Sequence, residues 1–148
     1  MNIEYQLQID AVKGERIFYK QYDKLILLTD GHIGVYLTEK ELKIDKSKMI
    51  EINETKDSIS LNPENLLRER TAAHETRIAR KTFPRGFAIK IQSKESEEYC
   101  FVQERFLKMF KGYDSLFIKS LKEPILVRKY GVPYGFIMPV FLSGQEGE

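Results

Sequence analysis

The sequence predicts an α+β fold in which antiparallel sheets are combined with one or two helices. Short β-rich runs recur along the chain, turn residues such as Asp30-Gly31 separate them, and two segments have helical features. The chain has 148 residues, enough for one domain that buries about two-thirds of its unfolded surface. We expect a single domain over residues 1–142 and a polar, disordered tail over 143–148.

The composition excludes several classes of protein. With 24 basic and 22 acidic residues the net charge is only +2, so any contact with DNA must come from local clusters of charge. The single cysteine, Cys100, cannot form an internal disulfide, which is typical of a reducing compartment. No apolar run approaches the roughly 20 residues of a transmembrane helix, and the N-terminus has no signal-peptide pattern. We therefore expect a cytoplasmic protein without a membrane span.

The N-terminal third contains the strongest strand signals. Residues 3–9 alternate between apolar and polar side chains, which predicts a half-buried strand, and residues 16–20 form a second candidate. Residues 24–29 and 32–37 are two β-rich runs that meet at Asp30-Gly31. This dipeptide is suited to a tight hairpin turn, so the two runs should pair.

The middle of the chain is rich in charge and less regular. A short strand is expected around residues 49–52. Asn62, Pro63 and Glu64 supply an N-cap, a first-turn proline and a favourable acid, so we predict a helix that begins there and runs to about Arg80. Its apolar side is thin. A strand over residues 87–92 follows.

The last third should form a strand, a helix and three antiparallel strands. After a strand over 99–102, the segment 103–111 has Val102, Phe106 and Phe110 four residues apart, which is the spacing of a helix face. We expect Phe106 and Phe110 to be buried. The three strands should cover residues 115–120, 125–130 and 134–142, with the last turn at 131–133.

Two clusters of basic residues are candidates for contacts with duplex DNA. Within the predicted helix a cation recurs every third residue, so an exposed cationic stripe should lie opposite the apolar one. A second cluster lies within residues 68–90. A solvated surface is the alternative for both clusters. The candidate residues are Arg105, Lys108 and Lys111 of the first cluster and Arg77 and Arg80 of the second.

Two short motifs resemble the bacterial DNA sliding clamp, the β subunit of the replicative polymerase. Thr29-Asp30-Gly31-His32 matches the start of the family motif T-D-G-H-R-L, with Ile33 and Gly34 in place of Arg and Leu. The run from Tyr134 to Leu142 is similar to the closing family run Y-x-x-x-M-P-M-R-L. It keeps Met138, Pro139 and Leu142 and has Val140 and Phe141 in place of Met and Arg.

The resemblance implies a DNA-clamp-like single domain, which in the family is a pseudo-duplicated unit whose helices, one per half, line the DNA side. Because residues 10–20 leave no room for a full helix before the first hairpin, the first half is expected to be reduced or rearranged. One domain cannot encircle DNA, so a homo-oligomer joined through edge strands is expected. The resemblance also implies an apolar pocket for a short peptide of a protein partner, formed by Thr29, Gly31, His32, Met138, Pro139 and Leu142.

Motifs for catalysis or metal binding are absent from the sequence. There is no nucleotide-binding glycine loop, no H-E-x-x-H and no cysteine pair. Asp30 and His32 would need a third metal ligand from His74 or a distant carboxylate, and no third group is spaced to orient Cys100 as a nucleophile. We therefore expect no enzyme, no cofactor and no metal.

Two functions remain open after the sequence is considered. The first is a clamp-like accessory of DNA replication or of a mobile element, for example a phage, which binds duplex DNA without sequence specificity and also a protein partner. The second is a small regulatory or interaction protein that keeps the clamp-like fold, with its basic segment 68–90 facing a protein or RNA partner. The oligomeric state should discriminate between them.

Overall fold

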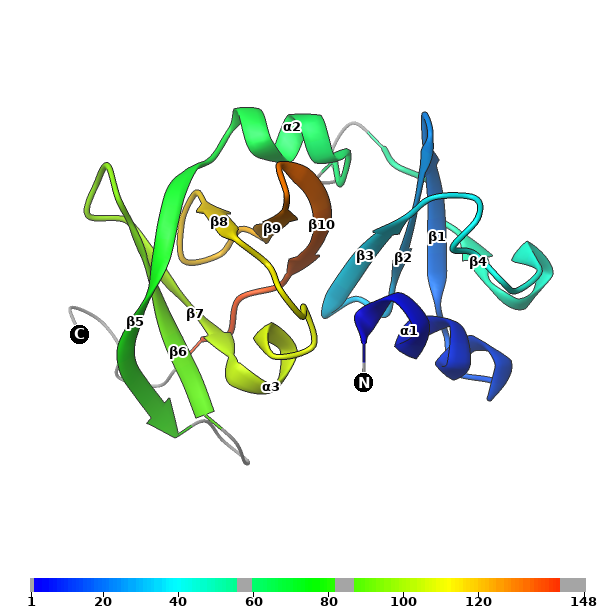
Figure 1. The fold of residues 1–148 in the computed structure, drawn as a ribbon, viewed down its shortest axis with the longest axis horizontal. Helices are drawn as coiled ribbons and strands as arrows, with labels where there is room; N and C mark the ends of the chain where they lie inside the picture. Colours follow the sequence, from blue (N-terminus) through cyan, green and yellow to red (C-terminus); the bar gives the residue numbers. More distant parts are fainter. Residues whose placement is uncertain (1, 56–59, 82–86, 142–148) are drawn as a thin grey trace.

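The computed structural model describes residues 2–55, 60–81 and 87–141, with the backbone alone for 77–81. This part of the chain contains three α-helices, one short 3-10 helix and ten strands (Figure 1). In chain order they are α1 (Ile3–Val12), β1 (Phe18–Tyr22), β2 (Leu25–Thr29), β3 (Ile33–Leu37), the 3-10 helix (Lys46–Lys48), β4 (Ile50–Glu51), α2 (Pro63–Arg68), β5 (Thr71–Lys81), β6 (Phe87–Ser93), β7 (Tyr99–Gln103), α3 (Glu104–Leu107), β8 (Ser115–Ile118), β9 (Ile125–Lys129) and β10 (Val132–Ile137).

All ten strands belong to one sheet, in the order β4-β1-β2-β3-β10-β9-β8-β5-β6-β7. Every pairing is antiparallel except that of β1 with β4, which is parallel. The α+β class is therefore confirmed. The expected one or two helices and purely antiparallel pairing are wrong, because the described residues contain three α-helices and one parallel pair.

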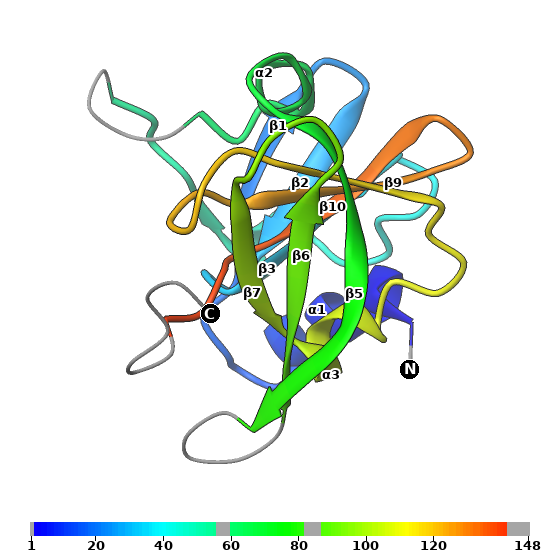
Figure 2. The same ribbon diagram turned by 90° about the vertical axis from the view of Figure 1, so that its left-hand side faces the viewer.

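The sheet has two parts that meet where β3 pairs with β10 (Figure 1). The larger part consists of β10, β9, β8, β5, β6 and β7. It curls back on itself, because the N–H of Val140, just after β10, donates to the carbonyl of Phe101 on β7 over 2.8 Å. Figure 2 shows β5, β6 and β7 in front of β9 and β10. One outer edge of the sheet is thus partly covered by the chain's own C-terminal segment.

Alternate side chains of the strands fill two cores, one on each side of the sheet. Ile26 and Leu28 of β2 point into the larger core, which α1 and α3 cover, whereas Leu27 points into the smaller core under α2. The start of α1 is joined to the turn that follows α3, since the N–H of Ile3 donates to the carbonyl of Met109 over 3.3 Å. Hence α1 and α3 lie on the same face of the sheet.

The segment predicted as an N-terminal strand is the helix α1. Ile3, Leu7 and Ala11 are buried at a spacing of four, while Tyr5 is 50% exposed, so the buried face follows a helix and not a strand. Their neighbour Gln8 is also buried and makes side-chain hydrogen bonds that only this helix allows. The expectation that no helix precedes the first hairpin is therefore wrong.

The helix predicted from Asn62 to about Arg80 ends at Arg68. Its start is confirmed, because Asn62 Oδ1 accepts the N–H of Glu64 over 2.9 Å and Pro63 occupies the first turn. Residues 71–81 are instead the strand β5, which pairs with β6 on one side and β8 on the other. Pairing on both edges outweighs the local helix propensity of an Ala-, Glu- and Arg-rich segment.

Most of the remaining strands agree with the sequence prediction. The β2–β3 hairpin turns at Asp30-Gly31, where Gly31 has φ +96° and Asp30 Oδ1 accepts the N–H groups of His32 and Ile33. The last turn is one position earlier than predicted, at Tyr130-Gly131, with φ values of +54° and +74°. Two successive positive φ values are typical of the tight turns that match strand twist.

Candidate functional site

The cationic segment that follows β7 has one buried side and one exposed side. Phe106 and Phe110 are buried in the larger core, and the Phe110 ring lies edge-on to Tyr134 at 5.1 Å. Arg105 and Lys108 are exposed, as the periodicity predicted. The helix itself is shorter than expected, with four residues, and turns continue the chain to Gly112, whose φ is +75°.

The exposed cations of this segment have few partners. Arg105 Nε donates to Gln103 Oε1 over 2.9 Å, and its guanidinium lies 4.5 Å from the Phe106 ring centroid. Lys108 Nζ lies 3.5 Å from Glu104 Oε1, but its side chain is 73% exposed, so solvent screens this pair. Lys111 is exposed and has no ion pair among the described residues. The segment therefore keeps a positive surface.

Arg77 and Arg80 lie on the strand β5, not on a helix. Both ribbon views place the far end of β5 at the end of the molecule where α3 lies (Figures 1 and 2). The loop after α3 is also fastened to β5, because the Tyr113 hydroxyl donates to Glu75 Oε2 over 2.5 Å. The backbone therefore brings the two predicted basic clusters to one end of the protein.

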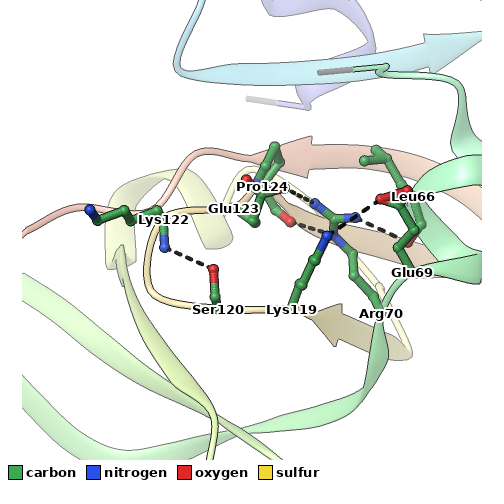
Figure 3. A network of polar contacts seen from close by, with 8 residues as sticks. All are labelled: Leu66, Glu69, Arg70, Lys119, Ser120, Lys122, Glu123 and Pro124. Carbon is green, nitrogen blue, oxygen red and sulfur yellow. Dashed lines mark hydrogen bonds and ion pairs between the residues drawn. The ribbon is translucent and has the colours of Figure 1, made fainter. Parts of the chain in front are cut away.

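The basic segment 68–90 is not one continuous surface. Arg70 has a fully buried side chain that lies between the end of α2 and the β8–β9 turn (Figure 3). Its Nε donates to the Pro124 carbonyl over 2.7 Å, Nη1 donates to the Leu66 carbonyl over 3.3 Å, and Nη2 lies 3.5 Å from Glu123 Oε1. Burial lowers the pKa of Arg70, and the Glu123 carboxylate opposes this shift. Arg70 is thus unavailable to a partner and acts in folding.

The two motifs that resemble the sliding clamp are brought together by the β3–β10 pairing. The N–H of Met138 donates to the carbonyl of His32 over 2.8 Å, and the His32 ring stacks on Phe106 at a centroid distance of 6.4 Å. Thr29 is buried; its hydroxyl donates to the Ile33 carbonyl and accepts the N–H of Gly31, over 2.7 and 3.0 Å. Thr29 therefore holds the turn in shape.

The residues that the resemblance assigns to a peptide pocket differ in their exposure. Gly31 and His32 are exposed, Met138 and Pro139 are half-buried, and Leu142 lies outside the described residues. Three grooves of the described surface, with volumes of about 460, 490 and 450 Å³, are lined by other residues. None of those three grooves is the predicted peptide pocket.

The groups considered for catalysis or metal binding do not form a site among the described residues. Cys100 is buried, and burial raises the pKa of its thiol to about 12, an effect that the charge of Arg70 opposes. A thiol held in its protonated form is a poor nucleophile. His74 is exposed on β5, and the part of the chain that the structure describes brings no three His, Cys, Asp or Glu side chains together.

Two grooves were not predicted from the sequence. One runs along α1 and is lined by apolar side chains that include Tyr5, Ile9 and Val12. The other lies between the start of α1, the segment after β3 and the β9–β10 hairpin, and contains Glu4, Glu41 and Tyr134. Residues so far apart in the chain carry no local signal that they meet.

Comparisons of the chain with protein-family models, with curated proteins and with solved structures find no match. Across residues 2–55, 60–81 and 87–141, no helix is long and apolar enough to cross a membrane. What the chain does must therefore be inferred from its own residues and from the two motifs that resemble the sliding clamp.

Proposed function

We propose that the protein is a non-catalytic, clamp-like protein that binds the phosphate backbone of duplex DNA as an oligomer. The observation that carries the proposal is the exposure of Arg105, Lys108 and Lys111 on a segment whose other side is buried. Arg77 and Arg80 lie on the strand that reaches the same end of the molecule. Together these five residues would form a positive surface on a chain of low net charge.

Binding by such a surface would depend on shape and charge, not on base sequence. Lysine and arginine neutralise phosphates and release the counterions condensed on DNA, so affinity falls as salt rises. Each phosphate contact adds about 0.9 to the steepness of the plot of log affinity against log salt concentration. Phosphate contacts position a protein on the duplex without reading bases. This agrees with a role in DNA replication or in the maintenance of a mobile element.

The arrangement of the elements supports the clamp-like part of the proposal. Each part of the chain has a helix followed by three antiparallel strands, α1 with β1–β3 and α3 with β8–β10. The strand order β1-β2-β3-β10-β9-β8 is symmetric about the β3–β10 pair. Both helices lie on one face of the sheet. A pseudo-duplicated unit with one helix per half is what the resemblance implies.

Salt-dependent DNA binding tests the proposal. We expect the wild type to bind duplexes of unrelated sequence with similar affinity. In the variant with Arg105, Lys108 and Lys111 changed to Glu, the slope of log affinity against log salt concentration should be smaller by up to about 2.7. Fluorescence anisotropy at several salt concentrations measures this. A control variant reverses three exposed lysines elsewhere, Lys24, Lys40 and Lys122, and should keep the wild-type slope.

The strand β5 provides a second, independent variant. Changing Arg77 and Arg80 to Glu should lower the slope by up to about 1.8, because each removed phosphate contact contributes about 0.9. If the wild type does not bind at low salt, or if the triple variant and its control behave alike, the DNA-binding role is wrong.

The alternative is a small regulatory or interaction protein with the same fold. The observation that favours it is the groove along α1, about 450 Å³ in volume, where Tyr5 and Val12 are 50% and 62% exposed. Exposed apolar side chains that line a groove are typical of protein-binding surfaces. Under this alternative, Val12→Glu would abolish partner binding while the triple variant of α3 would not.

A further inference from the structure

The groove between α1, the segment after β3 and the β9–β10 hairpin has the features of a ligand site. Its volume is about 490 Å³, and its lining combines two carboxylates, Glu4 and Glu41, with tyrosine rings and apolar side chains. Concave sites with apolar walls and a few convergent polar groups are the usual places for small ligands. We infer that this groove binds a protonated amine carried on an apolar stem.

Glu4 supplies the first argument for a cationic ligand. The Glu4 carboxylate accepts a hydrogen bond from the Tyr134 hydroxyl, and its buried Oε2 atom has no other hydrogen-bond partner among the described residues. A buried carboxylate oxygen without a partner is unfavourable, because it has lost its contacts with water. An ammonium group in the groove would place the opposite charge beside this carboxylate.

The backbone that carries the two acids is fixed beside the groove by the buried side chain of Gln8. Gln8 is 3% exposed, and its Nε2 donates to the backbone carbonyls of Glu4 and Glu41, over 2.8 and 3.0 Å. The Glu41 carboxylate is further positioned by the N–H and hydroxyl of Thr38, over 2.8 and 3.0 Å. The backbone of both acids and the carboxylate of Glu41 are therefore already ordered before a ligand binds, which favours binding.

Aromatic side chains complete a site that suits an amine. Tyr134 is 7% exposed and lines the groove, and burial together with the Glu4 carboxylate raises the pKa of its hydroxyl. The faces of tyrosine rings attract cations. The exposed Tyr130 and Val132 form an outer wall, which matches an apolar stem.

Lys129 provides a second test, because removing its charge should change the affinity for an amine in the opposite direction from removing the acids. Its ammonium lies 5.4 Å from the Tyr134 ring centroid and 5.7 Å from that of Tyr130, and it forms no ion pair with Glu4 or Glu41. The groove thus contains two negative groups and one positive group. A bound amine would be attracted by the acids and repelled by Lys129, so removing Lys129 should tighten binding.

The experiment is an NMR titration of the full-length protein with n-pentylammonium. We expect shifts of the backbone amides around Glu4, Glu41 and Tyr134, with pentan-1-ol as a neutral probe that binds at least tenfold more weakly. Glu4→Gln and Glu41→Gln should each weaken binding about tenfold, and Lys129→Met should strengthen it several-fold. Glu64→Gln, an exposed acid in the neighbouring groove beside α2, should change nothing.

Several results would overturn the inference. Equal binding of the alcohol and the amine would mean an apolar groove only, and unchanged affinity in both glutamine variants would mean adventitious binding. Weaker binding by Lys129→Met would make this lysine a part of the site and not a competitor. Because the variants retain size and shape, one-dimensional spectra check that each is folded before it is titrated.

Titrations with spermidine and with N-acetyl-lysine methylamide distinguish the source of the amine. Tighter binding of spermidine indicates a free polyamine, and tighter binding of the lysine derivative indicates a side chain of a protein partner. If neither binds and only n-pentylammonium does, both natural sources are wrong. The groove is lined by none of the five residues proposed to contact DNA, so different variants test the two proposals, although the Tyr134 hydroxyl also hydrogen-bonds with the backbone of Lys111.

Discussion

At the scale of single residues, burial decides which charges act in folding and which are available for binding. Arg70 and Lys119 are both basic residues near the β8–β9 turn (Figure 3). The Arg70 side chain is fully buried against Glu123, whereas Lys119 and its partner Glu69 lie 3.8 Å apart and are 48% and 57% exposed. Buried pairs are costly to break and exposed pairs are not.

We predict that Glu123→Gln lowers the free energy of unfolding by about 1–3 kcal/mol, because it leaves the buried Arg70 charge without its counter-charge. The control Glu69→Gln removes the exposed pair and should cost less than about 1 kcal/mol. Urea unfolding at neutral pH measures both. Equal effects of the two variants would show that the Arg70–Glu123 pair has no special role.

Cys100 gives a prediction about pH. The folded thiol has a pKa of about 12, raised by burial from 9.0. Above pH 9 the unfolded chain loses this proton while the folded chain keeps it, so stability falls as pH rises, by about 1.4 kcal/mol per unit.

Between pH 9 and 10 the free energy of unfolding should therefore fall more steeply in the wild type than in Cys100→Ala. The variant is expected to be less stable at pH 7 as well, because it leaves a small cavity, but that cost does not depend on pH. Urea titrations with a reducing agent present compare the two slopes. Parallel pH profiles would mean that the thiol titrates normally in the folded protein.

At the scale of elements, two glycines allow β3 and β10 to join the parts of the sheet. A Cβ on Gly135 would overlap the Gly34 carbonyl oxygen and the Phe110 ring, and a Cβ on Gly34 would overlap the Phe136 ring. Neither side chain can be added without moving backbone or a buried aromatic ring. The pairing that brings the two clamp-like motifs together thus depends on these positions.

We predict that Gly135→Ala destabilises the protein by about 3 kcal/mol or more, because overpacking here displaces backbone as well as side chains. The matched control is Gly131→Asn in the β9–β10 turn, where φ is +74° and the nearest atom to an added Cβ is 3.9 Å away. Asn tolerates positive φ, so this change should cost less than about 1 kcal/mol. Thermal or urea unfolding of both variants decides the question.

At the scale of the whole molecule, the sheet ends in two edges of different kinds. One edge is β4, which has two residues, and the other is β7, where Phe101 already accepts a hydrogen bond from Val140. Along a strand, the backbone N–H and C=O groups of every second residue point to the same edge. Tyr99 and Gln103, like Phe101, therefore direct these groups away from β6. Exposed edges of this kind are places where a second copy can pair.

We therefore predict a homo-oligomer joined through strand edges. Light scattering at tens of micromolar should give a multiple of 17.4 kDa. Replacing Ile50, which is 43% exposed on β4, by Lys should reduce the mass if that edge is used, because edge lysines oppose strand pairing. A strictly monomeric mass would contradict the clamp role and leave the fold as described.

The sequence by itself determined the elements whose signals are local. The β2–β3 hairpin follows from Asp30-Gly31, the start of α2 from Asn62 and Pro63, and the burial of Phe106 from its spacing with its neighbours. In each case the contacts that form the element lie within a few residues of one another. Such contacts can be read from the pattern of side chains.

Only the tertiary structure decided the features that depend on distant contacts. The alternation over residues 3–9 predicted a strand, but packing against the sheet selected the helix α1 instead. Residues 71–81 became a strand because partners were available on both edges. The burial of Arg70 and the meeting of Glu4 with Glu41 arise in the same way. Long-range pairing and burial outweigh local propensities of a few tenths of a kcal/mol per residue, and a single sequence does not reveal which distant segments will meet.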